Sequence, residues 1–131
     1  MDSSKGTWVA VGENGAIFSS VGGETWTKRH SGTRERLWRV RCDGDRWIAV
    51  GLGGSIVTSR DGTVWGAANS GTQQMLIDVR YADGLWVVVG NDGTILTSSD
   101  GIAWTKRSSG TAKLPPSYLV PPGKVNVIQI R

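Results

Sequence analysis

The chain has 131 residues, of which 19 are glycine and seven are tryptophan, and its formal net charge is +4. This length suits one domain that spans residues 1–131 and buries a core of its own. The basic excess is too small for a dedicated nucleic-acid binder. Because Cys42 is the only cysteine, an internal disulfide and a cysteine-rich metal site are excluded.

No stretch approaches the roughly 18 consecutive apolar residues of a membrane span, which argues against membrane insertion. The first residues, MDSSKGTW, contain no apolar run of the kind that a secretory signal needs. We therefore expect synthesis in the cytoplasm without export through a signal peptide.

One passage occurs three times, at residues 8–26, 47–65 and 86–104. The step between copies is 39 residues throughout, and no insertion breaks it. A fixed period of about 40 residues indicates a repeat architecture. The boundaries that we assign to the three repeats are about 6–36, 37–75 and 76–112.

Each repeat predicts four short strands joined by tight turns. In the second copy, residues 37–42 alternate in the manner of a strand, and further strands are expected at 47–51, 55–59 and 64–68. Asn-Gly and Asp-Gly pairs predict hairpin turns, since both central residues favour positive φ. These pairs and their equivalent are Asn14-Gly15, Asp92-Gly93 and Gly53-Gly54. The chain begins with TWVAV, the second strand of a repeat, so we expect the first repeat to lack its inner strand.

A seven-residue motif at the last hairpin of each repeat carries a family resemblance. Its copies are Ser59-x-Asp61-Gly62-x-x-Trp65 and Ser98-x-Asp100-Gly101-x-x-Trp104, while the first copy, at 20–26, has lost the aspartate. The motif resembles the Asp-box, or BNR, repeat of sialidase-type β-propellers, and the repeats are similar to those of photosystem II assembly-factor propellers. The resemblance covers residues 6–111. It implies an all-β fold of four-stranded antiparallel blades, three per chain, in which the Asp-box shapes the fold and does not catalyse.

Propellers have four to eight blades, so three are too few to surround an axis. We expect oligomerisation to complete the ring, with a six-bladed homodimer favoured and a nine-bladed homotrimer left open. Residues 125–131 look like a fourth inner strand, whose apolar residues are Val125, Val127, Ile128 and Ile130. We expect this strand to complete the first blade of the partner. It would cross on a stiff proline-rich arm at 113–124, which contains Pro115, Pro116, Pro121 and Pro122.

Catalytic residues are hard to find in this sequence. His30, the only histidine, lies in a turn, so no nucleophile–histidine arrangement can be argued. Sialidase-type hydrolysis needs a tyrosine nucleophile, but Tyr81 is repeat-equivalent to Cys42 on an inner strand. The acidic turns lack the ligand count of a calcium loop. We assign no catalytic residue, no metal and no cofactor, and we expect a protein that is not an enzyme.

Two sets of residues are candidate contacts for a ligand or a partner. The first set holds one tryptophan per repeat, which packs blade against blade or stacks a sugar as in propeller lectins: Trp8, Trp47 and Trp86. The second set is basic where most equivalents in the next repeat are not: Arg34, Arg36, Arg39, Arg41 and, at its end, Arg46. These arginines could bind an acidic partner or ligand, pair across a subunit with Asp78, or remain solvated.

The leading functional hypothesis is a non-catalytic, self-assembling propeller that acts as a structural or interaction module. In concrete terms it would be a phage virion component, such as a capsid decoration or a tail-associated protein. Its partners would be further copies of itself, and other virion proteins or surface glycans. The repeat already accounts for the aromatic residues, which argues against nucleic acid as a partner. The alternatives are a glycan-binding lectin with one site per blade and a degenerate sialidase-like hydrolase.

Overall fold

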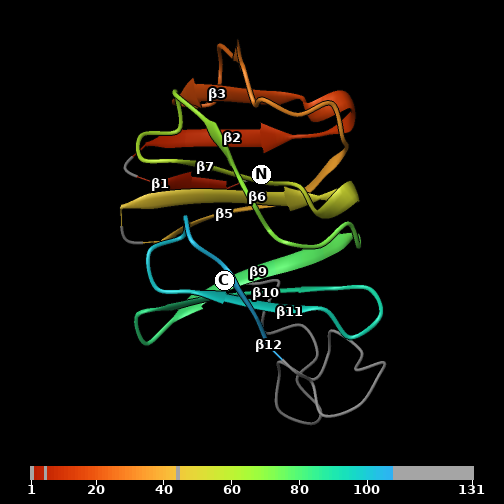
Figure 1. The fold of residues 1–131 in the computed structure, drawn as a ribbon. Coiled ribbons are helices and arrows are strands. Elements are labelled where there is room, and N and C mark those ends of the chain that lie inside the picture. Colours follow the sequence, from red (N-terminus) through yellow and green to blue (C-terminus); the bar gives the residue numbers. More distant parts are fainter. Residues whose placement is uncertain (1, 5, 44, 108–131) are drawn as a thin grey trace, which may run out of the picture.

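The structure, a computed structural model, describes residues 2–4, 6–43 and 45–107 of the chain. Their regular structure is all-β: three antiparallel sheets, each a meander of four strands, with no α-helix in the described ranges. This confirms the predicted fold class at the level of secondary structure. Figure 1 shows the sheets stacked in chain order, with the first at the top of the view and the third at the bottom.

The bounds of the strands follow the 39-residue step. The first sheet contains β1 (Asp2–Ser4), β2 (Thr7–Val11), β3 (Ile17–Val21) and β4 (Thr27–Arg29). The second contains β5 (Leu37–Asp43), β6 (Arg46–Gly51), β7 (Ile56–Ser59) and β8 (Gly66–Ala68). The third contains β9 (Leu76–Ala82), β10 (Leu85–Gly90), β11 (Ile95–Ser98) and β12 (Thr105–Arg107). Single 3₁₀ turns, η1 (Glu13–Gly15) and η2 (Leu52–Gly54), join the second and third strands of the first two sheets.

The expectation that the first repeat lacks its inner strand is wrong. Asp2 on β1 pairs with Val9, which is the register of Arg41 with Ile48 moved back by one repeat. The three polar residues of β1 show no apolar alternation, so its sequence carries no strand signal of its own. The arm at 113–124 and the segment at 125–131 lie outside the described residues. However, a first sheet that already holds four strands needs none from a partner.

The predicted turn chemistry is confirmed at the hairpins between second and third strands. Asn14 and Asp92 have φ of 58° and 56°, and the glycine after each has φ of 69° and 72°. Gly53 and Gly54 take the same left-handed conformation, at 66° and 74°. A Cβ at Gly54 would also overlap the backbone carbonyl of Thr72, so this position has no room for a side chain. The turn therefore depends on glycine for both its dihedral angles and its packing.

Two hydrophobic cores lie between the sheets, one at each joint. The first joins Val9 and Ile17 of the first sheet to Trp47 and Ala49 of β6. The second joins Ile48 and Val50 of the same strand to a set from the third sheet, which includes Leu76, Val79, Trp86, Val88 and Leu96. Because successive residues of a strand point to opposite faces, β6 supplies both cores and reads as a continuous apolar run.

The sheets form a row in which only the second is covered on both faces. Contacts between sheets join β1 and β2 to β5 at the first joint, and join β5 and β6 to β9 at the second. Figure 1 shows the same order, with the second sheet between the other two. In the described part of the chain, the first and third sheets therefore each present one face that no neighbouring sheet covers.

Candidate functional site

The three repeated tryptophans have different environments in the three sheets. Trp47 and Trp86 are 3% and 2% exposed, because each packs into the core against the preceding sheet. Trp8 occupies the same repeat position on β2 but is 37% exposed. The first sheet has no preceding sheet among the described residues to cover it. Of the predicted tryptophan contacts, the structure therefore leaves only Trp8 at the surface, and it does not bring the three together.

A hollow surrounds Trp8 on the uncovered face of the first sheet. Trp8 and Trp26 line it together with Gly22 and Gly23 of the hairpin between β3 and β4, and its volume is about 430 Å³. The indole Nε1 of Trp26 donates a hydrogen bond to the Gly23 carbonyl at 3.1 Å, which holds the turn against the ring. We call this surface, made of Trp8, Gly22, Gly23 and Trp26, the leading face.

The uncovered face of the third sheet carries an apolar groove. Arg80, Ala82, Leu85 and Val87 line the groove, which has a volume of about 170 Å³, and Leu85 is 39% exposed. We call this surface the trailing face. Sequence reasoning missed it, although a signal was available: Leu85 and Val87 lie 78 residues, or two repeats, after Thr7 and Val9.

The two internal joints show what each kind of face does when it is covered. A Cβ at Gly62 would lie 3.3 Å from Trp47 Nε1 and 3.4 Å from methyl groups of Thr7 and Val9. The hairpin of the second sheet thus rests on the second strand of the first sheet. Gly101 repeats the contact one joint later, where its neighbours are the side chains of Arg46 and Ile48.

The leading and trailing faces are the two halves of this joint. Gly23 on the leading face corresponds to Gly62 and Gly101, since 62 and 101 lie one and two repeats later. Leu85 and Val87 on the trailing face correspond to Thr7 and Val9. One end of the row therefore presents the surface that, inside the chain, packs on the surface presented by the other end.

The predicted arginine set does not form one cluster. Arg36 lies over the ring of Trp38, 4.8 Å from its centroid. Arg39 Nε lies 3.8 Å from Asp78 Oδ1 across the second joint, and Arg41 Nε lies 3.2 Å from Asp43 Oδ2. Arg34 is exposed. Arg46 lies on β6, with its side chain against Gly101. Three of the five side chains therefore interact with an aromatic ring or a carboxylate of the chain, and the pairing with Asp78 is made between sheets of one chain.

Asp78 is the buried member of that pairing. It is 4% exposed, and burial raises the pKa of its carboxyl above the ordinary value, while the Val79 N–H and Arg39 oppose the rise. The Val79 N–H donates to Asp78 Oδ1 at 2.8 Å. Asp78 Oδ2 has no hydrogen-bond partner among the described residues. Asp78 is thus a buried carboxyl group at the joint that has a nearby arginine and one hydrogen bond, but only one of its two oxygens is hydrogen-bonded within the described residues.

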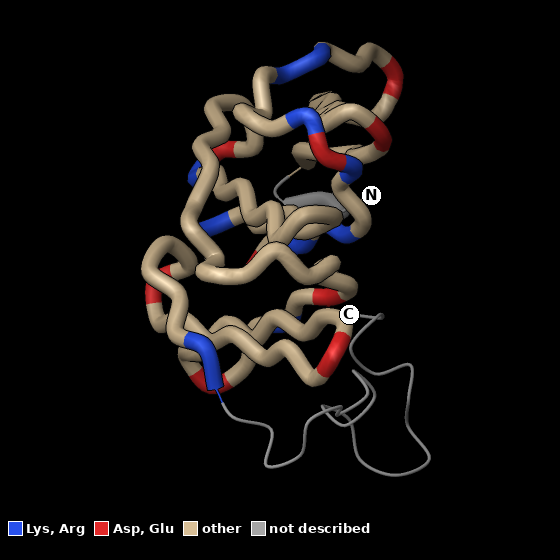
Figure 2. Tube along the Cα trace, turned by 45° about the vertical axis from the view of Figure 1, so that its right-hand side comes forward, with Lys and Arg blue, Asp and Glu red and all other residues tan. Residues whose placement is uncertain are grey.

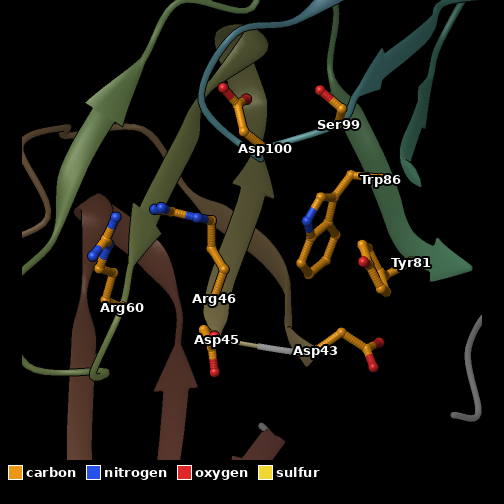
Figure 3. A pocket seen from close by; sticks show the side chains of 8 residues that line it. All are labelled: Asp43, Asp45, Arg46, Arg60, Tyr81, Trp86, Ser99 and Asp100. Carbon is orange, nitrogen blue, oxygen red and sulfur yellow. The ribbon is translucent and has the colours of Figure 1, made fainter. Parts of the chain in front are cut away.

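Charged side chains gather around a polar pocket at the outer part of the second joint. Its volume is about 450 Å³, and it is lined by Asp43, Asp45, Arg46, Arg60, Tyr81, Trp86, Ser99 and Asp100 (Figure 3). The Tyr81 and Trp86 rings meet there with centroids 4.8 Å apart and planes tilted by 52°. Sequence reasoning missed this joint pocket because its residues come from four separate strands and three hairpin turns.

The aspartates of the repeated hairpins are occupied by their own turns. Asp100 Oδ1 accepts hydrogen bonds from the N–H groups of Ile102 at 2.8 Å and Ala103 at 3.0 Å, and Ser98 Oγ donates to it at 2.9 Å. These bonds lower the pKa of Asp100 to about 2. Asp61 makes the same set of bonds one repeat earlier, and its pKa is also lowered.

Elsewhere in the described part of the chain, charged residues do not gather into a surface of one sign. Basic and acidic residues are interspersed over all three sheets (Figure 2). Within the described ranges, no group of three or more His, Cys, Asp or Glu side chains could hold a metal ion. No helix in that part of the chain is long and apolar enough to cross a membrane.

Comparison with known proteins adds no relative to this description. No protein-family model matches the chain, and no curated protein matches it significantly. The fold and its surfaces define an all-β protein of three stacked four-stranded sheets. Within the described residues, its distinguishing surfaces are two uncovered end faces and a charged joint pocket.

Proposed function

We propose that the chain is a non-catalytic, self-assembling module that contributes three propeller blades to a ring made from more than one copy. The observation that carries the proposal is the exposure of Trp8, which is 37% against 3% for Trp47 and 2% for Trp86. A residue that is core at two joints and surface at a third position marks a joint whose other half is missing. A second copy supplies that half.

The copies would join head to tail, with the leading face of one on the trailing face of the next. In that arrangement Gly23 and Trp8 pack on the partner's Leu85 and the partner's Val87, in the geometry that the two internal joints already use. A head-to-tail contact closes into a ring when its rotation allows. Two copies supply six blades, which is within the four to eight that propellers use.

Covering the exposed side chains of the two faces contributes favourable free energy to such a joint. A tryptophan buries about 150–250 Å² in a core, and burial contributes about 25 cal/mol per Å². Covering the exposed third of Trp8 is then worth about 2 kcal/mol per joint, and Leu85 adds a comparable amount. A closed ring of two copies contains two such joints, so the contributions add.

The test uses one charged substitution on each face. We expect the natural chain to run at twice its 14.0 kDa mass in light scattering behind size exclusion. Trp8→Glu and Leu85→Lys should each run as monomers. In a ring of two identical copies, each substitution would bury one unpaired charge in both joints. Mixing the two variants should restore a dimer, since one joint is then natural and the other places glutamate against lysine.

Trp38→Lys provides the matched control. Trp38 is 39% exposed, as Trp8 nearly is, but it lies on β5 of the central sheet and on neither end face. This variant should stay dimeric. A dimeric Leu85→Lys variant would show that copies do not meet head to tail, and a monomeric natural chain would remove the proposal altogether.

A further inference from the structure

We propose that the joint pocket binds a small organic oxyanion, meaning a carboxylate, sulfate or phosphate on a scaffold of about monosaccharide size. The pocket's volume of about 450 Å³ suits a ligand of that size. The residues that form it all belong to one chain, so this site goes beyond the proposed assembly and does not depend on it.

The charges in the pocket are specific to the second joint. Arg46 stands where the other repeats have Thr7 and Leu85, and Arg60 stands where they have Val21 and Ser99. Because the first joint forms with a threonine and an exposed valine at these positions, the fold does not require either arginine. Two guanidinium groups at one joint, and none at the equivalent positions of the other repeats, indicate a ligand.

Both guanidinium groups are available to a ligand. Neither the Arg46 nor the Arg60 side chain makes an ion pair or a hydrogen bond with any residue in the described ranges. In the view of Figure 3 both groups lie on the same side of the pocket, with Trp86 and Tyr81 on the other. The aliphatic stem of Arg46 passes over Gly101, where a Cβ would overlap Arg46 Cδ. Paired guanidinium groups suit an oxyanion, since each offers a planar fork of N–H donors.

Asp45 and Asp100 stay charged, but no carboxylate in the described ranges lies within ion-pair distance of Arg46 or Arg60. Asp43 is paired with Arg41, and Asp100 Oδ1 accepts N–H groups of its own turn. Asp45 is exposed, and in Figure 3 it lies at the opposite end of the Arg46 side chain from the guanidinium. The oxyanion therefore binds at the arginine side. The hydroxyl groups of Tyr81 and Ser99 are left for polar groups on the scaffold.

Isothermal titration of the full chain in buffer of about 20 mM ionic strength tests the site, because low salt leaves charge interactions unscreened. The probes are inorganic phosphate, glucuronate and uncharged glucose. Arg46→Met keeps an unbranched stem over Gly101 but loses the charge, and Arg60→Ser installs the residue that the third repeat carries. We expect each variant to weaken oxyanion binding about tenfold or more. Arg34→Met, which changes an exposed arginine outside the pocket, should bind as the natural chain does.

Asp45→Asn separates an oxyanion site from a neutral-sugar site. Removing a nearby negative charge should tighten oxyanion binding about two- to fivefold. If Asp45 instead held the hydroxyl groups of a sugar, its removal would weaken binding. Binding of phosphate alone or of glucuronate alone supports the proposal and names the oxyanion. Glucose binding as tightly as glucuronate, weaker binding by Asp45→Asn, or no binding of either anion would each overturn it.

Discussion

Gly54 shows at the scale of the residue how little room the tightest turns leave. Its φ is +74°, and the backbone carbonyl of Thr72 occupies the space that a Cβ would need. Gly15 is in the same position one repeat earlier, against the carbonyl of Thr33. Both constraints come from the chain passing directly behind the hairpin, so the glycine is needed for packing as well as for its dihedral angles.

Gly54→Ala should therefore lower the free energy of unfolding by about 2–4 kcal/mol, from backbone strain together with overpacking. Urea unfolding followed by tryptophan fluorescence measures the change. Gly66→Ala on β8 is the matched control, because nothing lies within 4 Å of a Cβ there and its φ is not positive. Its effect should stay within about 0.5 kcal/mol. Equal effects at the two positions would mean that the turn relaxes around a side chain.

Asp61 and Asp100 show at the scale of the element how the same hairpin is held in two different ways. In the second and third sheets a carboxylate accepts the N–H groups of the residues that follow it in the turn. The first sheet has Gly22 in place of the aspartate and uses two left-handed glycines, Gly22 and Gly23, with φ of 87° and 89°. All three hairpins keep the bond from the final glycine N–H to the serine Oγ, at 2.8 to 3.0 Å.

The lowered pKa values make these two turns sensitive to acid. A carboxyl whose pKa is lower in the folded chain stabilises it above the unfolded value of 3.8, and the contribution is lost as pH falls toward about 2. The double variant Asp61→Asn with Asp100→Asn should therefore show a flatter decline of thermal stability across that pH window. Asp92→Asn, in a different exposed turn, should keep the natural slope. An unchanged slope in the double variant would show that the two carboxylates do not titrate with folding.

The row of three sheets determines at the scale of the whole molecule which surfaces remain for association. The second sheet is covered on both faces, so the apolar residues of β6 and β7 lie in the two cores. The leading and trailing faces keep the same residue positions without a covering sheet. A molecule built by repetition therefore presents a self-complementary pair of surfaces at its two ends, unless its row closes on itself.

If copies join through these faces, thermal stability depends on protein concentration. A dimer that unfolds to monomers gains about 1.4 kcal/mol per tenfold rise in concentration, which for two chains of this size raises Tm by about 3 °C. Differential scanning calorimetry over two decades of concentration measures the shift. Leu85→Lys should show no such dependence. A natural chain with a constant Tm would contradict association through folded end faces.

Most of the fold could be predicted from the sequence, because its signals are local. Hairpin glycines and apolar strands depend on neighbouring residues, and the 39-residue step repeats these local signals. Eleven of the twelve described strands follow from them. The exception, β1, consists of the residues Asp, Ser and Ser, which form a strand only because β2 offers a free edge. Pairing of that kind depends on the neighbouring strand, so the sequence of β1 itself contains no signal from which it could be predicted.

The sequence by itself determined the repeat, the strand order within each sheet and the turns, since these follow from periodicity and backbone conformation. Only the tertiary structure decided which repeated residues are core and which are surface. Trp8, Trp47 and Trp86 are the same residue at the same repeat position, and their exposure differs because burial depends on the neighbouring sheet. The joint pocket was decided in the same way. Arg46, Arg60 and Tyr81 lie far apart in the chain and meet only where the second sheet stacks on the third.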